Sequence, residues 1–517
     1  MIRATVIFGF LFVVSDSLLF SKIKDRQGPP PVIETDRDNL VNFRRNKAIL
    51  LNREFSMTLG YNLSLTPMEE LANEAITKAK LKEIDEGFFD PATFTPSFQF
   101  YESLDKIESS PLYHFIRTMP KGGILHAHDT ALGSSKILVD FTYKRFCWIC
   151  FHKDESIEFT FSRIQPKPTK NCENWQLMED YRRNGGMSDA ELSKKFKLTT
   201  ERTFTDVNDV WSAFEPIFGA VGGVIGYQDN FGEYIDRTFQ ELLDDGVQYV
   251  ELRTSLRGLY DLDGNYLPRS ETGKVIKRVV SDFMKKNPSF IGAKVIFSRS
   301  RQTDSMTVEE YLNEAVELKS QFPNFMCGFD LVGQEDLGKP LQEFIPELLR
   351  APNSMDFFFH AGETNWYGTT TDENLFDAVM MHPKRIGHGY ALNKHPLVVD
   401  LVKQLDICIE VNPLSNQVLH LVQDLRNHPA AYFIANNFPM VVSSDDPGFW
   451  GAAPLSHDFY VTFLGIASAH ADLRLLKQLA INSIKYSCMS HNQKAVAFKK
   501  WKQSWNRWIK YVVSLRN

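Results

Sequence analysis

The sequence predicts an α/β fold: a (β/α)8 TIM barrel with an N-terminal helical extension and a small disulfide-stapled insertion after the first strand. Short apolar runs alternate with helical stretches, which is typical of a parallel α/β sheet. Several of these runs end in His, Asp or Glu, and a parallel barrel carries its reactive side chains at the carboxyl ends of its strands. The 517 residues, 13% of them aromatic, are enough to bury a large core.

Eight short apolar runs are the candidate barrel strands, and helical stretches such as 308–319 lie between them. The runs are 123–128, 249–253, 293–298, 326–332, 356–360, 385–390, 407–411 and 440–444. A doubly wound sheet is the alternative fold. It would not bring the first, fifth and eighth strands to a single centre, so the barrel is favoured.

The start of the chain is typical of a secretory signal peptide, which we expect over residues 1–20. Arg3 supplies a positive charge, residues 6–14 are apolar, and small residues follow. A buried N-terminal helix or a membrane anchor is the alternative. The apolar run is too short to span a bilayer, and no later run reaches the ~18 apolar residues of a membrane helix. We therefore expect a secreted, extracellular protein without a membrane span.

Residues 21–110 form the expected N-terminal dimerisation segment, with a helical pattern from about residue 35 to 105. Thr66 can cap a helix that has Pro67 at its first position and Glu69 reaching back to the cap. The apolar residues that follow at helical spacing are Met68, Leu71, Ala72, Ala75, Ile76 and Ala79. This face needs a partner, either the barrel or a second subunit. Asn62 begins an Asn-Leu-Ser glycosylation sequon.

Residues 111–135 are expected to hold the first barrel strand, and residues 136–200 an insertion with three clustered cysteines. Cys147 and Cys150 have the spacing of a zinc knuckle or a redox pair, but no second C-x-x-C completes a zinc site. An exported chain meets an oxidising compartment. A disulfide from Cys172 to Cys147 or Cys150 is therefore expected, with Cys150 favoured.

Residues 201–517 are expected to complete the barrel and to end in an amphipathic helix from about residue 493. The apolar stripe of this helix is Phe498, Trp501, Trp505, Trp508 and Val512, and basic residues are interleaved with it. Packing of the stripe on the barrel is favoured over a glycan- or membrane-binding helix. The net charge of −6 comes from 58 basic and 64 acidic residues mixed along the chain, which argues against a nucleic-acid partner.

His126 and His128 end the first candidate strand, one residue apart. Side chains alternate faces along a strand, so both imidazoles point the same way, about 6–7 Å apart. Both can therefore reach one metal ion at Zn–N distances of about 2 Å. An H-x-H pair alone is weak evidence, but three further strand ends supply the missing parts of a hydrolytic metal site.

These three strand ends carry His360 with Glu363, His388 between two glycines, and Asp445 with Asp446. Zinc in a hydrolytic site takes nitrogen and oxygen ligands and keeps one position open for water. That ligand set is His126, His128, His360 and Asp445, holding one zinc ion per subunit. Glu363 is placed to move a proton between water and substrate, while His388 and Asp446 would orient the water or act as base.

Each of these residues alone also has a purely structural explanation. His360 fits a core histidine, and Asp445-Asp446-Pro447 fits the start of a helix with proline in its first turn. Their joint occurrence at strand ends favours the metal site. The histidines without such a context are expected to be surface or structural residues: His382, His395, His420, His428 and His457.

The four motifs, H-A-H at 126–128, H-A-G-E-T at 360–364, R-I-G-H-G at 385–389 and S-S-D-D-P at 443–447, resemble those of adenosine deaminases of the metallo-dependent amidohydrolase superfamily. The signal peptide, the N-terminal helices and the cysteine-bearing insertion resemble the secreted branch, the adenosine deaminase-related growth factors. The resemblance covers essentially the whole mature chain. The chain does not match the H-x-E and P-C-x-x-C zinc motifs of cytidine deaminases.

The resemblance implies a role for each site residue. Zinc would be held by His126, His128, His360 and Asp445. Glu363 would protonate N1 of a purine, and His388 and Asp446 would position the hydroxide. Asp446 would also bind N7, the backbone of Gly333 would meet N3, and Trp211 would flank the ribose. The resemblance further implies a homodimer through the N-terminal helices and an insertion that binds a cell-surface receptor. A glycan is the alternative surface partner.

The predicted activity is therefore hydrolysis of adenosine and 2′-deoxyadenosine to inosine and 2′-deoxyinosine with release of ammonia. Growth-factor activity would follow from the removal of extracellular adenosine. An AMP or adenine deaminase is the alternative enzyme, since the metal motifs do not distinguish these substrates, although no Arg/Lys cluster for a phosphate is evident at the strand ends. A receptor-binding growth factor that acts independently of catalysis is the alternative from another class.

Overall fold

The computed structural model describes residues 39–153, 156–199 and 202–515, and the expected signal peptide lies outside them. The chain divides into two units, residues 1–56 and 57–517. The described part of the first unit is the helix α1 (Leu40–Ser56). Its exposed large apolar side chains are Leu40, Val41, Phe43, Ile49, Leu50 and Leu51. None of the helices described here combines the length and apolarity needed to cross a membrane.

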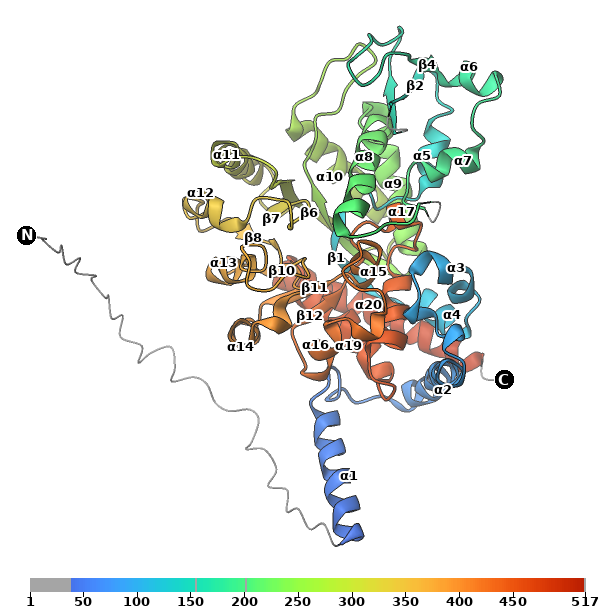
Figure 1. The fold of residues 1–517 in the computed structure, drawn as a ribbon, viewed down its shortest axis with the longest axis vertical. Helices are drawn as coiled ribbons and strands as arrows, with labels where there is room; N and C mark the ends of the chain where they lie inside the picture. Colours follow the sequence, from blue (N-terminus) through green and yellow to red (C-terminus); the bar gives the residue numbers. More distant parts are fainter. Residues whose placement is uncertain (1–38, 154–155, 200–201, 516–517) are drawn as a thin grey trace, which may run out of the picture. The chain divides into compact units, whose positions relative to one another are not determined.

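The second unit is built on a barrel of parallel strands (Figure 1). In the described part of the chain these strands are β1 (Gly122–His128), β5 (Val247–Thr254), β6 (Gly292–Ser300), β7 (Met326–Val332), β8 (Asp356–Phe357), β9 (His360–Ala361), β10 (Arg385–His388), β11 (Cys408–Val411) and β12 (Met440–Val442). They pair in the orders β1-β5-β6-β7-β8 and β9-β10-β11-β12. Ala127 pairs with Asp445 in parallel, which joins the end of β12 to β1 and closes the barrel. The TIM-barrel prediction is thus confirmed.

The predicted fifth strand, 356–360, is divided into β8 and β9. The backbone amide of Phe358 still donates to the carbonyl of Phe329 in β7 at 3.0 Å. The amide of His360 instead donates to a carboxylate oxygen of Asp330, also at 3.0 Å. A side-chain acceptor therefore replaces the backbone partner, and regular pairing is interrupted where the candidate metal ligands begin.

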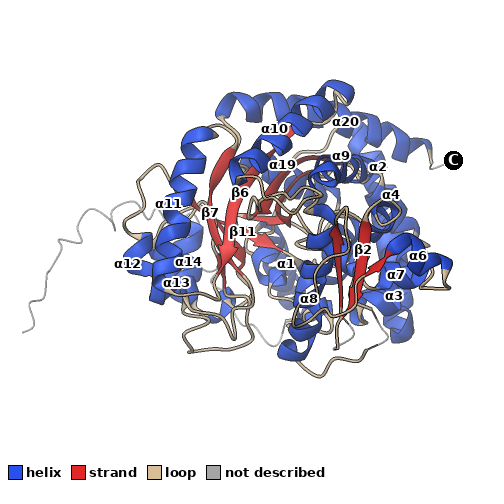
Figure 2. Ribbon diagram, turned by 90° about the horizontal axis from the view of Figure 1, so that it is seen from above, coloured by secondary structure: helices blue, strands red, loops and turns tan. Residues whose placement is uncertain are grey.

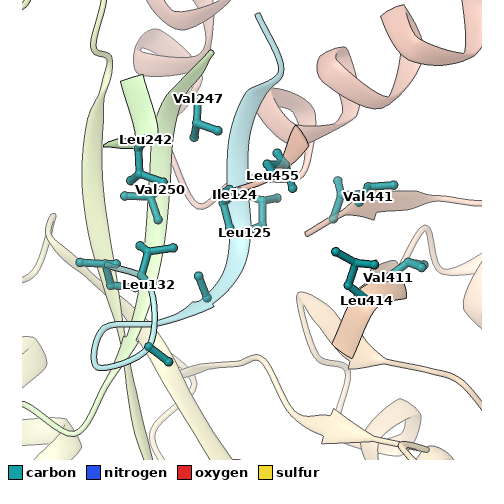
Figure 3. Close-up of a cluster of buried hydrophobic side chains, with 14 of the residues drawn as sticks. Ile124, Leu125, Leu132, Leu242, Val247, Val250, Val411, Leu414, Val441 and Leu455 are labelled. Atoms are coloured by element: carbon teal, nitrogen blue, oxygen red, sulfur yellow. The ribbon is translucent and has the colours of Figure 1, made fainter. Parts of the chain in front are cut away.

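The core around β1 explains why this strand is so apolar (Figure 3). Ile124 and Leu125 are fully buried. They lie among Val247 and Val250 of β5 on one side and Val411 of β11 and Val441 of β12 on the other. Fully burying one such aliphatic side chain contributes about 1.5–3 kcal/mol to stability.

Helices surround the strands (Figure 2). Those that follow or separate the later strands are α8 (Val207–Ile225), α9 (Gln228–Asp244), α10 (Arg269–Lys286), α11 (Ser305–Gln321), α12 (Ile345–Leu348), α13 (Asn374–Met380), α14 (Pro396–Gln404), α15 (Pro413–Val418), α16 (Ala430–Ala435), α17 (Pro447–Trp450), α18 (Ser456–Val461) and α19 (Leu473–Lys485). Short 3₁₀ turns are η2 (Pro91–Thr93), η3 (Thr95–Ser97), η4 (Leu341–Phe344), η5 (Leu392–Lys394) and η6 (Leu425–Asn427), and η7 (Thr462–Ile466) is a π-helix. The observed α11 contains the predicted helix 308–319.

In the described part of the second unit, three helices precede β1: α2 (Pro67–Phe89), α3 (Phe100–Glu108) and α4 (Pro111–Arg117). The predicted capping box of α2 is confirmed, because Thr66 and Glu69 bond each other's backbone amides through their side chains. The predicted apolar face is wrong in part, since Met68 and Leu71 are 41% and 39% exposed. The buried face is rotated because Glu69 is drawn inward by the indole of Trp505 at 2.7 Å and by Lys477 at 2.7 Å.

The C-terminal helix α20 (His491–Ser514) packs against α2 and α19. The predicted burial of its tryptophan stripe is confirmed for Trp501, Trp505 and Trp508, whereas Phe498 is 40% exposed. Each buried indole nitrogen has a hydrogen-bond acceptor, as an amphipathic ring requires when it leaves water. The stripe is therefore part of the core.

The insertion between β1 and β5 lies at one end of the barrel (Figure 1). It contains a small antiparallel sheet of β2 (Cys147–Phe151), β3 (Ile157–Phe161) and β4 (Gln176–Leu177), with α5 (Ser135–Phe141), α6 (Met178–Arg183) and α7 (Asp189–Lys194). A disulfide joins Cys150 to Cys172, the pairing that the sequence favoured, and Cys147 is a buried free thiol. A second disulfide, Cys327–Cys488, was not foreseen.

Candidate metal centre and active site

Four histidines from three strands meet at the carboxyl ends of the barrel strands. His126 and His128 belong to β1, His360 begins β9 and His388 ends β10. The ring centroid of His126 lies 4.5 Å from that of His360, 4.9 Å from that of His388 and 5.6 Å from that of His128. The barrel thus brings together residues that are up to 262 positions apart.

Asp445, just after β12, faces these histidines. Its Oδ1 lies 3.2 Å from Nε2 of His126 and 3.2 Å from Nε2 of His128. Its Oδ2 lies 3.8 Å from Nε2 of His388 and accepts a hydrogen bond of 2.8 Å from the hydroxyl of Ser415. The carboxylate is therefore fixed by Ser415 with one oxygen directed at the imidazoles.

The geometry fits a divalent metal ion. Nε2 of His126, Nε2 of His388 and Oδ1 of Asp445 are buried and have no hydrogen-bond partner among the described residues. Buried polar atoms are nearly always bonded, so three orphaned atoms at one point indicate a ligand. Two groups of ligand atoms lie within 4.8 Å of one another: His126, His360, His388 and Asp445, and His128, Asp445 and Asp446. Imidazole nitrogens with a carboxylate oxygen are the ligands of catalytic zinc.

Glu363 lies beside this cluster, with Oε1 at 3.4 Å from Nδ1 of His388. The backbone amides of Gly362 and Glu363 each donate to the carboxylate of Glu335 at 3.1 Å, which fixes this turn. Burial, followed by the negative charges of Asp445 and Glu335, raises the pKa of Glu363 well above its ordinary value. A buried carboxyl group with a raised pKa is suited to act as a general acid toward a substrate.

Asp446 is the second buried acid, and burial together with Asp445 raises its pKa well above the ordinary value. Burial would also raise the pKa of Asp445, but the facing His126 and His128 hold this pKa well below the ordinary value for an aspartate. The pKa values of these two adjacent carboxyl groups are thus shifted in opposite directions, as in other sites that need both an acid and an anion. Asp446 precedes α17 but makes no side-chain cap bond, so the helix-start explanation does not account for it.

The backbone is strained at two of the site residues. His388 has φ +62° and Asp445 has φ +61°, in the left-handed region that residues with a Cβ seldom adopt. Such a conformation costs about 1–3 kcal/mol and is found where the surrounding structure over-determines it, often at active sites. Here it turns each side chain from the end of its strand toward the shared centre.

The two remaining candidate substrate-binding residues, Gly333 and Trp211, lie at the same end of the barrel in different surroundings. Gly333 follows β7 with φ +107°, and an added Cβ would meet no atom within 4 Å, so its backbone faces open space. Trp211 lies on α8, partly buried against Phe214, which in turn stacks on Trp450 four residues beyond Asp446. The predicted glycosylation residue, Asn62, is exposed before α2.

The sequence interpretation missed the residues that hold the histidines in place. Nδ1 of His126 lies 2.8 Å from Glu410, and Nδ1 of His360 lies 2.8 Å from Asp330. Both carboxylates are fully buried. The available signal was a charged residue inside an otherwise apolar strand, since Asp330 is in β7 and Glu410 is in β11.

Comparisons with known proteins agree with this geometry. A family model described as adenosine deaminase matches residues 188–501, and one described as adenosine/AMP deaminase N-terminal matches residues 31–116. Adenosine deaminase of Lutzomyia longipalpis is 46% identical over 474 residues, covering 90% of this chain and 93% of the relative. Adenosine deaminase 2 of Homo sapiens is 42% identical over 479 residues, covering 90% of this chain and 93% of the relative.

Solved structures share the fold at low sequence identity. An arabidopsis ADAL structure complexed with GMP has a TM-score of 0.55 at 15% identity, covering 76% of this chain and 98% of that one. A cog1816 amidohydrolase from Burkhoderia ambifaria with bound Zn has a TM-score of 0.56 at 16% identity, covering 78% of this chain and 95% of that one. From the family model that spans more than half of its length and from relatives that match it almost throughout, the chain belongs to the adenosine deaminase family and is an aminohydrolase.

Proposed function

We propose that the protein is a secreted, zinc-dependent adenosine deaminase that hydrolyses adenosine and 2′-deoxyadenosine to inosine and 2′-deoxyinosine. The observation that carries the proposal is the convergence of four histidines and Asp445, with orphaned buried ligand atoms, in a relative of proteins named adenosine deaminase. One water is consumed in the reaction. Its oxygen replaces the amino nitrogen at C6 of the purine, and the nitrogen leaves as ammonia.

Each site residue has a task in this reaction. His126, His128, His360 and Asp445 would hold the zinc ion, which when bound lowers the pKa of a water ligand to about 7. Glu363, buried beside His388, would donate its proton to N1 of the purine. His388 and Asp446 would orient the water and receive its proton.

The remaining contacts would place the purine and the sugar. Asp446 would meet N7, and the backbone of Gly333, which no side chain covers, would meet N3. Trp211 would flank the ribose from α8. Adenosine, AMP and adenine all offer these ring nitrogens, so the choice of a nucleoside over AMP rests on the sequence, in which no Arg/Lys cluster for a phosphate is evident at the strand ends.

The direct test is ammonia release from adenosine, 2′-deoxyadenosine, AMP and adenine, together with the zinc content of the purified protein. We expect turnover of the two nucleosides and about one zinc per subunit. Glu363→Gln keeps the size of the side chain but removes the acid, so kcat should fall by about 10²–10⁴-fold with zinc content unchanged. Preferred turnover of AMP or adenine, or full activity of Glu363→Gln, would contradict the proposal.

Secretion, dimerisation and a role of the insertion are further parts of the proposal. The signal-peptide pattern, the disulfides and the exposed Asn62 sequon support an extracellular glycoprotein. The exposed apolar side chains of α1 support a homodimer formed through the N-terminal helices. Light scattering of the full chain and of a chain beginning at Met57 tests this, with dimer expected for the first and monomer for the second.

The insertion is proposed to bind a cell-surface receptor or a glycan, and growth-factor activity to arise from removal of adenosine. Glu363→Gln separates binding by the insertion from removal of adenosine, since it should largely abolish catalysis and leave the insertion intact. If this variant retained the full effect on cells, signalling independent of catalysis would be the better account.

A further inference from the structure

Five charged side chains are fully buried beneath the candidate metal centre. They are Glu251, Arg253, Asp330, Arg385 and Glu410, each at most 1% exposed, and they come from β5, β7, β10 and β11. The interior of such a barrel is usually filled by branched apolar residues. Even when buried charges are paired, they seldom stabilise a fold more than well-packed apolar residues would, so this cluster requires a reason beyond the stability of the fold.

Arg253 lies between the two carboxylates that face the histidines. Its Nη2 donates to Glu410 at 2.7 Å, and its Nε donates to Asp330 at 2.7 Å. The same Glu410 oxygen accepts from Nδ1 of His126 at 2.8 Å, and the same Asp330 oxygen accepts from Nδ1 of His360 at 2.8 Å. One guanidinium group therefore connects the supports of two candidate zinc ligands.

The orientation of this guanidinium group is fully determined. Nη1 of Arg253 donates to the carbonyl of Leu125 and Nη2 to the carbonyl of Phe358, both at 3.1 Å. These carbonyls lie next to His126 and two residues before His360. Arg385 supports the other oxygen of Glu410 and also donates to Glu251 at 2.6 Å. A lysine would carry the charge but not the planar set of donors.

We propose that Arg253 is a positioning residue that sets the direction in which His126 and His360 present their nitrogen atoms to the metal ion. With Nδ1 of each ring donating to a carboxylate that Arg253 holds, Nε2 is the atom left to bind. The carboxyl groups of Glu410 and Asp330 lie against the two imidazoles, and partners of this kind make an imidazole a stronger metal ligand. The inference rests on the proposed zinc site and concerns its affinity rather than the substrate.

The test is the zinc dissociation constant of the full chain, measured by competition with a chelator, for the wild type, Arg253→Lys and Glu410→Gln. We expect both variants to bind zinc about 10–100-fold more weakly, the range found when such supporting partners are removed. The visible absorption spectrum of the Co²⁺-substituted protein should change in both, because the ligand directions change. A loss of stability alone would leave that spectrum unaltered.

Lys121→Met is the matched control. Lys121 is also a fully buried cation and donates to the carbonyl of Asp245 at 2.6 Å, but it has no bond to the five-residue cluster. The control should lower the melting temperature and leave the zinc affinity and the Co²⁺ spectrum unchanged. An equal loss of affinity in Lys121→Met would overturn the inference, since general destabilisation would then explain the result.

A double-mutant cycle keeps the inference falsifiable even if one variant folds poorly. If Arg253 acts through Glu410, the double variant should lose less zinc-binding free energy than the sum of the losses in Arg253→Lys and in Glu410→Gln. Additive losses, or wild-type affinity in Arg253→Lys, would overturn the positioning role while leaving the enzyme assignment intact. A wild-type protein that binds no zinc would instead overturn the proposed function.

Discussion

Gly387 shows how tightly the residues of the candidate metal centre are packed. A Cβ added at this position in β10 would lie 2.8 Å from Cε1 and 3.1 Å from Nδ1 of His126. Both distances are shorter than an ordinary van der Waals contact, and the ring of His126 is held at Nδ1 by Glu410. A side chain at residue 387 would therefore displace the His126 imidazole.

We therefore expect Gly387→Ala to displace His126 and to weaken zinc binding about tenfold or more, as when a supporting group is lost. The zinc dissociation constant checks this. Gly219→Ala in α8 is the control, because no atom lies within 4 Å of the added Cβ. It should leave zinc affinity unchanged and raise helix stability by up to about 1 kcal/mol. Unchanged zinc affinity in Gly387→Ala would mean that the ring has room to move.

At the level of elements, the insertion and the barrel have separate sources of stability. The small sheet of β2, β3 and β4 is closed by the Cys150–Cys172 disulfide, whose cysteines are 22 residues apart. Trp175 packs against this disulfide, with Trp148 partly buried beside it. The candidate metal ligands belong to barrel strands or, for Asp445, to the loop that follows β12.

Replacing both cysteines, as Cys150→Ser with Cys172→Ser, should destabilise the insertion by about 3 kcal/mol, the value expected for a loop of this size. Hydrogen exchange of the backbone amides in β2 and β3 should become faster. Zinc content and ammonia release should stay at the wild-type level, because the site lies on the barrel. Loss of zinc in this variant would show instead that the insertion supports the site.

At the scale of the whole molecule, a buried histidine ties the N-terminal helices to the barrel. His457 of α18 stacks on Tyr113 of α4 with ring centroids 4.7 Å apart, and its Nδ1 accepts from the amide of Ala453 at 2.8 Å. Burial lowers its pKa to about 3. The charged groups that face it are Glu108 at 3.9 Å, Asp245, Arg117 and Lys121.

This pKa has a consequence for stability in acid. In the unfolded chain a histidine titrates near 6.5. Between about pH 6.5 and pH 3 the unfolded state therefore binds more protons at His457 than the folded state does, so stability falls as the pH falls through 6.5. The loss is at most about 1.4 kcal/mol per pH unit for this group.

His457→Gln removes this titration and isolates the effect. At pH 7 the variant should have a lower free energy of unfolding than the wild type, because the ring stacking is lost. At pH 5 this difference should be smaller, because only the wild type loses stability through His457 as the pH falls. Urea unfolding at the two pH values, with the same metal concentration throughout, measures it. A difference that stays constant between pH 7 and pH 5 would show that His457 does not titrate in this way.

The barrel class, the approximate strands and the residues that converge on the site were accessible from the sequence. The reason is physical: strand and helix periodicities are local, and a parallel barrel places the carboxyl ends of all its strands at one face. His126 and His128 end one apolar run, and His360, His388 and Asp445 each lie at or just after the end of another. Their grouping followed from the fold class, with no knowledge of distances.

Only the tertiary structure showed which residues that are distant in the sequence contact one another. The bridge between Ala127 and Asp445 that closes the barrel, and the hydrogen bonds of Arg253 to Asp330 and Glu410, join residues 77 or more positions apart. The same holds for the Cys327–Cys488 pairing, and for Trp505, which turns Glu69 of α2 inward. A local pattern marks a buried charge as unusual but does not name its partner, because that partner is chosen by packing geometry.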